Sequence, residues 1–253
     1  MRIFAVSDIH VDYDENREWV FNLSQQDYKD DGLILAGDIT NNLDLLKKTF
    51  EVLKNRFKEI FFVPGNHDLW VRHTNIPCSI EKFRLIKKIA DDFHVHMKPV
   101  NFSDLVVVPL LGWYDYSFGK PKDNLKNIWA DYSACKWEKD LDDRAITDYF
   151  VEKNNEFLKI KNKNVVSFSH FLPRIDLMPS FIPPDKRILY PVLGSSKLEE
   201  QIKKLNSDIH IYGHSHVNRR VTLDSTLYIN NAFGYPYETM ITRKELVCVF
   251  ESG

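Results

Sequence analysis

The chain has 253 residues, 43% of them hydrophobic, with 17 Phe, 11 Tyr and 5 Trp, so it can bury a sizeable core and is not intrinsically disordered. Its 34 basic and 36 acidic residues nearly cancel and give no bulk signal for nucleic acid or a membrane surface. The longest apolar stretch, residues 105–113, is about half as long as a transmembrane helix requires.

The three cysteines and the N-terminal residues 1–8 indicate the cellular compartment. Cys78, Cys135 and Cys248 are odd in number and far apart, which suits a reducing environment better than a disulfide framework. Asp8 stands where a signal peptide would keep its apolar region, so residues 1–8 are interpreted as the start of a first strand. We therefore expect a soluble cytoplasmic protein with no membrane partner.

Short apolar runs alternate with helical patterns in the first hundred residues. The expected elements are strands at 2–7, 33–36 and 60–63, helices at 16–27, 43–57 and 80–91, and short strands near 93–97 and 105–111. Strands that are separated by helices pair in parallel, and such sheets bind ligands at the carboxyl ends of their strands.

Two long irregular segments interrupt the second half of the chain. Residues 112–140 lose all periodicity and are rich in aromatic residues, and residues 173–191 hold five of the eleven prolines. Around them we expect a helix at 141–161 and strands at 165–168, 208–212, 217–223, 226–231 and 246–251. The economical prediction is one domain, residues 1–253, in which the loops 112–140 and 173–191 wall the functional site.

Polar side chains follow the predicted strands at the points where the strands end. They are Asp8, His10, Asp38, Asn66, His67, Asp68, His170, His214 and His216. Carboxylate, amide and imidazole donors without thiolates suit borderline ions such as Mn, Fe or Zn. Each fragment alone is common in turns, but five of them in order at strand ends are hard to explain by chance.

The order Asp-x-His, Gly-Asp, Gly-Asn-His-Asp, Ser-His and Gly-His-x-His, spread over residues 8–216, resembles the calcineurin-like metallophosphoesterases. The resemblance implies an α/β fold of four αββα layers, with two mixed β-sheets packed as a sandwich between helices. It also implies a phosphohydrolase with two metal ions, Mn, Fe or Zn, at the strand ends. Ser169 departs from the pattern, because many members have glycine before this histidine.

The resemblance also assigns roles to individual residues. One metal ion would be held by Asp8, His10 and His216, the other by Asn66, His170 and His214, and Asp38 would bridge them. His67 would face the leaving oxygen, with Asp68 as the residue that orients it. The implied reaction is attack of a metal-activated hydroxide on a small-molecule or nucleotide phosphoester.

Several alternatives remain open. The run Asp38-Ile39-Thr40-Asn41-Asn42 lacks the arginine of protein Ser/Thr phosphatases and the tyrosine of purple acid phosphatases. Monoester, diester and pyrophosphate substrates therefore all remain. A non-catalytic interaction scaffold of the same fold is the alternative function, disfavoured because the ligand set and His67 are complete. The sequence shows no cluster of basic residues of the kind that lines a nuclease groove. Nothing in the sequence indicates an oligomeric state.

Two further residues are candidates for contacts with the substrate. Arg174, four residues after His170, is expected to clamp a phosphate oxygen. Trp113 stands at the start of the aromatic segment and is expected to offer its ring to the substrate. Most of this segment should pack on itself and leave one or two rings at the site.

Overall fold

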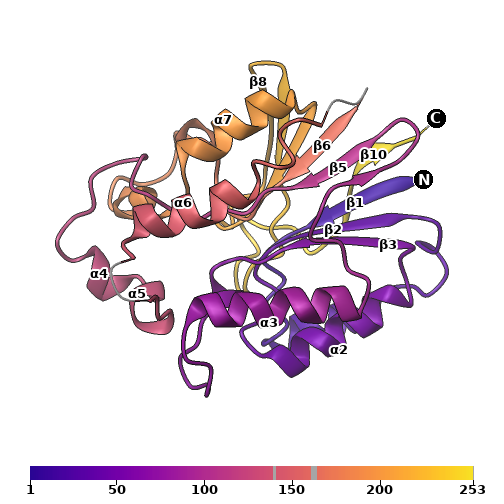
Figure 1. Cartoon of the computed structure of the whole chain (residues 1–253), viewed down its shortest axis with the longest axis horizontal. Helices are drawn as coiled ribbons and strands as arrows, with labels where there is room; N and C mark the ends of the chain where they lie inside the picture. The colour runs from indigo at the N-terminus through magenta and orange to yellow at the C-terminus, as the bar shows by residue number, and fades with distance from the viewer. Residues whose placement is uncertain (139–140, 161–163, 253) are drawn as a thin grey trace.

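Two β-sheets lie face to face in the computed structural model, which describes residues 1–138, 141–160 and 164–252 (Figure 1). The first sheet has the strand order β10-β1-β2-β3. Its strands are β1 (Arg2–Val6), β2 (Gly32–Ala36), β3 (Glu59–Val63) and β10 (Val247–Glu251). The first three are parallel, and β10 is antiparallel to β1, so the sheet is mixed.

The second sheet has six strands in the order β4-β5-β6-β7-β9-β8. They are β4 (Val100–Asn101), β5 (Val106–Pro109), β6 (Val165–Phe168), β7 (Ile209–Tyr212), β8 (Arg219–Leu223) and β9 (Thr226–Asn230). The four central strands are parallel, whereas β4 and β8 pair antiparallel at the two edges. The carboxyl ends of the parallel strands therefore meet at one edge of each sheet.

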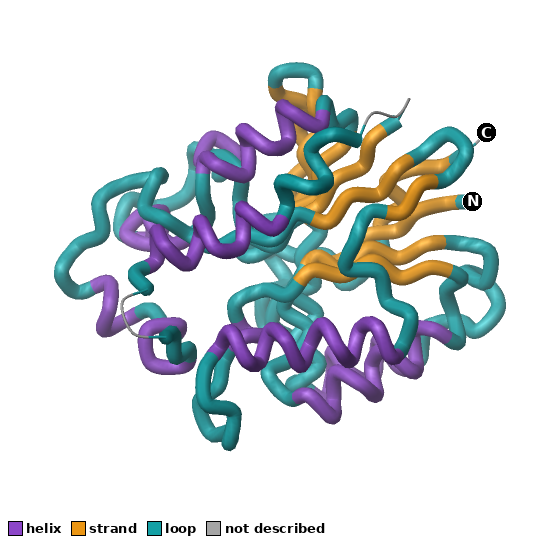
Figure 2. Tube along the Cα trace, in the orientation of Figure 1, coloured by secondary structure: helices purple, strands orange, loops and turns teal. Residues whose placement is uncertain are grey.

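Helices cover both outer faces of the sandwich (Figure 2). The α-helices are α1 (Asp14–Phe21), α2 (Leu43–Lys54), α3 (Ser79–Asp92), α4 (Leu125–Ile128), α5 (Asp131–Ala134), α6 (Asp143–Lys153) and α7 (Ser196–Leu205). Three 3₁₀ segments are η1 (His67–Leu69), η2 (Ile175–Leu177) and η3 (Lys186–Val192). Among the helices described here, none has the length and apolar character needed to cross a membrane.

The parallel strands are buried on both faces, which explains why they are continuous apolar runs in the sequence. One core lies between the sheets and contains Ile3, Ala5, Ile34, Phe61, Val107, Val166 and Ile211. The alternate side chains of the same strands, such as Phe4 and Leu33, pack against Phe50 of α2 and other helical residues. The four-layer αββα architecture with two mixed sheets is confirmed.

Some element boundaries differ from the predictions. The helix predicted at 16–27 is α1 and ends at Phe21. Beyond it the Ser24 hydroxyl accepts hydrogen bonds from the backbone N–H groups of Gln26 and Asp27, which favours a turn over further helix. The strand predicted near 93–97 is reduced to a single bridge between His96 and Phe61.

The second half shows similar differences. The helix predicted at 141–161 is α6, and position 161 lies outside the described residues. Helix α7 was not predicted at all. It begins at Ser196, where the Ser195 hydroxyl caps it by accepting a hydrogen bond from the Lys197 N–H, and it packs Leu198 and Ile202 into the core.

Candidate metal centre

The backbone at the strand ends is turned in an unusual way. Asp8, His10, Asp38, His214 and His216 all have positive φ angles, between 40° and 66°. A residue with a side chain pays about 1 kcal/mol or more for this left-handed conformation. Such strain concentrates at functional sites. Here it bends the chain back after β1, β2 and β7, so that side chains from separate strands face one crevice.

One group of side chains gathers around His170, which follows β6. Its Nε2 atom lies 3.1 Å from Nδ1 of His214 and 3.0 Å from the Asn66 side-chain oxygen. It also lies 3.5 Å from a carboxylate oxygen of Asp38. Asn66, Asp38, His170 and His214 come from four different strand ends and are all buried.

A second group gathers around His216. Its Nε2 atom lies 3.1 Å from a carboxylate oxygen of Asp8 and 3.2 Å from Nε2 of His10. Asp38 lies between the two groups. A carboxylate oxygen of Asp38 is within 4.8 Å of ring nitrogens of His170 and His214, and one is also within 4.8 Å of ring nitrogens of His10 and His67. The structure thus brings the seven expected ligands together as two sets that meet at Asp38.

The hydrogen bonds of His170 and His214 on the side away from each other indicate which nitrogen of each ring is protonated. Nδ1 of His170 lies 2.9 Å from the Ala36 carbonyl oxygen, and Nε2 of His214 lies 3.0 Å from that of Val192. Carbonyl oxygens only accept, so these two nitrogens carry the ring protons. Burial lowers the pKa of both imidazoles, which favours the neutral form.

The two inner nitrogens of His170 and His214 therefore present lone pairs to each other across 3.1 Å. A metal ion between them would turn this repulsion into coordination. Hydrogen bonds from the outer nitrogen to a carbonyl or carboxylate are also the usual support of histidine ligands. The donor chemistry of the site therefore fits metal ions bound by nitrogen and oxygen.

Glu238 supports the second group in the same way. Its carboxylate lies 2.6 Å from Nδ1 of His216, opposite the nitrogen that faces Asp8. The same Glu238 carboxylate accepts a hydrogen bond from the backbone N–H of Tyr235. Sequence reasoning missed Glu238, because it lies in an irregular segment after β9 with no motif around it.

Close packing of the loops depends on glycine. A Cβ atom on Gly37, whose φ is +86°, would lie 2.4 Å from Nδ1 of His170, and a Cβ on Gly65 would lie 2.1 Å from an Asp38 oxygen. Any side chain at either position would push a proposed ligand out of place. The glycines of the Gly-Asp and Gly-Asn-His-Asp motifs are therefore required by the site itself.

Asp68 has a different role from the one expected. Its buried carboxylate accepts hydrogen bonds from the backbone N–H groups of Gly65, Asp38, Ile39 and Thr40, at 2.8 to 3.0 Å. Burial raises its pKa to about 6, against the lowering by these backbone N–H groups. It braces the loops after β2 and β3 against each other and so orients the backbone of Asp38, not the His67 ring.

His67 lies beside the two groups. Its backbone N–H donates to Asp38 at 2.9 Å, and its ring centroid lies 4.7 Å from that of His10. The ring stacks on Trp70 with centroids 3.7 Å apart, and its Nε2 atom lies 3.5 Å from the Tyr235 hydroxyl. The structure therefore adds Trp70 and Tyr235 as partners of His67.

Asp131 links three residues of the site. Its buried carboxylate accepts hydrogen bonds from the Asn66 amide at 2.8 Å and from the indole N–H groups of Trp70 at 2.7 Å and Trp129 at 2.8 Å. Burial raises its pKa to about 6, although these donors lower it. Sequence reasoning missed Asp131, and the only signal was its place in the aromatic segment.

Neither predicted substrate contact lies at the site. Trp113 is completely buried and packs against Trp137 and Phe171, because its large ring fills the core beneath helix α6. The Arg174 guanidinium is held by carboxylates of Asp176, Glu199 and Asp224 at 2.7 to 3.3 Å, so it is not directed to a phosphate in the crevice. Both predictions are wrong.

A cavity of about 270 Å³ opens over the side chains of Asp38, Asn66, His67, His214 and His216. Its walls include Trp129, from the segment 112–140, and Leu189, from the segment 173–191. Tyr235 completes the wall and is followed toward the surface by Tyr237, whose ring stacks on it at 5.6 Å. The mouth of the cavity is therefore mainly apolar and aromatic.

The fold and the site together define a class of protein. The sequence profile of calcineurin-like phosphoesterases matches residues 1–218, and the chain belongs to this family. It is a phosphohydrolase, an enzyme that hydrolyses phosphoester bonds, with candidate metal-binding groups of Asp and His. Of the two functions that the sequence left open, these findings support the enzyme.

Two relatives cover nearly the whole chain. The [Acyl-carrier-protein] phosphodiesterase PptH of Mycobacterium tuberculosis is 26% identical over 93% of this chain and 78% of its own length. The uncharacterized protein L509 of Acanthamoeba polyphaga mimivirus is 25% identical over 94% of this chain and 93% of its own length.

Solved structures show the same fold. The crystal structure of phosphopantetheinyl hydrolase (PptH) from Mycobacterium tuberculosis matches 99% of this chain and 96% of its own, with a TM-score of 0.84 and 23% identity. The protein TT1561 of Thermus thermophilus matches 91% of this chain and 89% of its own, with a TM-score of 0.52 and 14% identity.

Proposed function

We propose that the chain is a phosphodiesterase with a binuclear metal centre. One ion would be held by Asp8, His10 and His216, the other by Asn66, His170 and His214, and Asp38 would contact both. The observation that carries this proposal is the pair of facing lone pairs on His170 and His214, 3.1 Å apart, next to the shared carboxylate of Asp38. Donors of this kind favour Mn, Fe or Zn.

When bound, the two ions would polarise the phosphate oxygens and lower the pKa of coordinated water. The protein prepares the site for them. The strained backbone at the ligands and the Asp68 brace hold the donors in position before any ion or substrate arrives, so little reorganisation is needed during the reaction.

We propose that His67 protonates the leaving oxygen. Its side chain is 18% exposed and lines the cavity, whereas the imidazoles of the ligand set are nearly buried. Stacking on Trp70 and the nearby Tyr235 hydroxyl hold the ring in place beside the proposed ligands. As an imidazolium it would donate the Nε2 proton to the oxygen that departs from phosphorus and return to the neutral ring, the form that burial favours by lowering the pKa of His67.

The proposed substrate is a phosphodiester that joins phosphopantetheine to a carrier protein. The support is the relative PptH, which is named both an acyl-carrier-protein phosphodiesterase and a phosphopantetheinyl hydrolase and shares 26% identity over 93% of the chain. The apolar, aromatic mouth formed by Trp129, Leu189 and Tyr235 also suits an extended organic group better than an inorganic anion. A protein-bound substrate would replace the small molecule expected from the sequence.

We further propose that residues 1–253 act as one domain, because both sheets share the core between them. The free thiols Cys78, Cys135 and Cys248 agree with a reducing compartment, and a cytoplasmic location stays a prediction.

Metal reconstitution tests the proposal. The purified chain would be stripped with a chelator, reloaded separately with Mn, Fe, Zn or Mg, and assayed on an aryl phosphodiester, an aryl phosphomonoester and a phosphopantetheinylated carrier protein. We expect two ions per chain and hydrolysis of both diesters. Asp38→Ala should deplete both ions, whereas Asp30→Ala, at an exposed carboxylate outside the proposed ligand set, should keep them. Full metal content in Asp38→Ala would contradict the proposal.

A further inference from the structure

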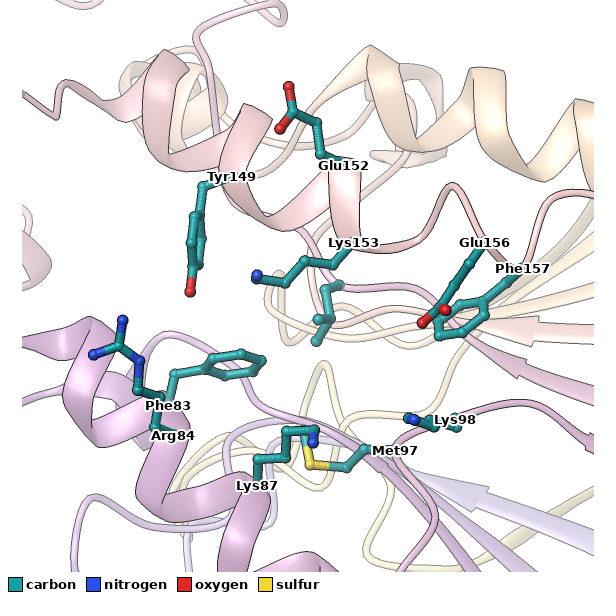
Figure 3. A pocket seen from close by; sticks show the side chains of 11 residues that line it. Phe83, Arg84, Lys87, Met97, Lys98, Tyr149, Glu152, Lys153, Glu156 and Phe157 are labelled. Atoms are coloured by element: carbon teal, nitrogen blue, oxygen red, sulfur yellow. The ribbon is translucent and has the colours of Figure 1, made fainter.

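A larger cavity, of about 730 Å³, lies between helices α3 and α6 (Figure 3). It shares no lining residue with the cavity over the metal centre. Its size is within the range of sites that hold small organic molecules, and it spans the helical layers of both sheets.

The floor of this cavity is apolar. Phe83 and Met97 are buried there, at 5% and 9% exposure, and Leu111 and Phe157 are partly buried around them. Aromatic and aliphatic surface of this kind gains free energy when an apolar group displaces water from it. The floor therefore suits the hydrophobic part of a ligand.

The rim of the same cavity is basic. Four of its lining residues are cationic, namely Arg84, Lys87, Lys98 and Lys153, and two are acidic, Glu152 and Glu156. The cavity is thus positive in a chain whose net charge is −2. In Figure 3 the Lys153 side chain extends across the opening above Phe83, and the Glu152 carboxylate points away from it.

Two of the rim cations, Lys87 and Lys153, have only weak partners of their own, whereas Arg84 pairs with Glu81 at 3.0 Å. The ammonium group of Lys153 lies 4.1 Å from the centre of the Tyr149 ring. Lys87 approaches Asp91 of its own helix at 3.8 Å, with both side chains about half exposed or more. Exposed pairs of this kind contribute little and are readily exchanged for a better partner. An anion that enters above the floor would find these lysines available.

We propose that this cavity is a second binding site, which takes an anionic amphiphile: a small molecule with an apolar or aromatic body and a negatively charged head. The body would cover Phe83 and Met97, and the head would lie between Lys87 and Lys153. A neutral ligand would make no ion pair with the rim cations, and a purely polar anion would leave the floor in water. The site is independent of the phosphodiesterase proposal.

Binding of 8-anilinonaphthalene-1-sulfonate tests this inference, with N-phenyl-1-naphthylamine as a probe that keeps the aromatic body and lacks the charge. Titrations followed by fluorescence would compare the full chain with the double variant Lys87→Glu/Lys153→Glu. Both positions are exposed, so the variant should fold. We expect saturable binding of the sulfonate that is about tenfold weaker in the variant, and little change for the neutral probe.

The matched control is Lys88→Glu/Lys159→Glu, which makes the same change in net charge at exposed positions outside the lining of the cavity. It should bind the sulfonate as the unchanged chain does. Equal weakening in both double variants would mean that only the overall charge matters and would overturn the site. Absence of saturable binding to the unchanged chain would overturn it as well.

Discussion

The imidazole of His67 and the indole of Trp70 stack with ring centroids 3.7 Å apart and an interplanar angle of 27°. The indole N–H of Trp70 donates in turn to Asp131 at 2.7 Å. Asp131, more than sixty residues away in the sequence, therefore fixes the Trp70 ring against which His67, the proposed proton donor, stacks. The orientation of His67 is decided by the loop that carries Asp131, not by its neighbour Asp68.

His67→Asn should keep the metal ions and slow the hydrolysis of alkyl esters by about 10²–10⁴-fold, since the leaving alkoxide then departs without a proton donor. Activated aryl esters, whose leaving groups need no proton, should lose much less. The measurement is kcat on the two ester types together with metal content. An equal loss on both esters would assign His67 to charge stabilisation, and loss of metal would make it a ligand or a structural residue.

Asp131→Asn should weaken binding of the ion held by Asn66, because the new amide can accept from fewer of the three N–H groups that now converge on the carboxylate. Loss of such a supporting partner typically costs about 10–100-fold in metal affinity or activity. Metal titration and kcat would be measured side by side. The control is Asp123→Asn, at an exposed position of the same segment. Identical behaviour of the two variants would refute this role.

Lys82 should give the stability of the protein an unusual pH dependence. This buried lysine donates to the carbonyl oxygens of Asn41 and Trp70, and burial lowers its pKa from 10.5 to about 8. The folded chain therefore binds this proton less tightly than the unfolded chain does. Relative to Lys82→Met, the free energy of unfolding should rise between pH 8 and 10.5, by up to about 3 kcal/mol.

Urea unfolding of both proteins at several pH values measures this difference. Asp68, whose pKa burial raises to about 6 although Lys82 lowers it, is already ionised throughout this range and does not contribute to the rise. A difference that does not change between pH 8 and 10.5 would show that Lys82 keeps an ordinary pKa in the folded protein.

Tyr237→Ser should slow hydrolysis of a protein-bound substrate more than that of a small one. The Tyr237 ring is 72% exposed and continues the aromatic stack that starts at His10 and Tyr235. Exposed aromatic rings next to an active site are typical contacts for a large partner. We expect kcat/KM on the carrier-protein diester to fall about tenfold, with the aryl diester unchanged as the internal control. Equal losses on both would place Tyr237 in the catalytic site instead.

The sequence pattern placed the proposed ligands at the ends of parallel strands, and the resemblance to the calcineurin-like metallophosphoesterases supplied the four layers. Buried strands must be continuous apolar runs, and strands joined by helices must pair in parallel, so residues directly after β1, β2 and β3 had to meet at one edge. Asp8, Asp38 and Asn66 could be placed together for that reason, without any coordinates. Histidines after β6 and β7 followed from the same rule applied to the second sheet.

Only the tertiary structure decided what surrounds these ligands. Asp131 and Glu238 lie in irregular segments, where no periodicity relates a residue to its neighbours in space, and each reaches the site through contacts between distant parts of the chain. Arg174 shows the same limit. It stands four residues from a proposed ligand, yet Asp224, fifty residues further on, draws its guanidinium away from the crevice. Side chains in loops take the partners that long-range packing supplies, and a local pattern carries no information about those partners.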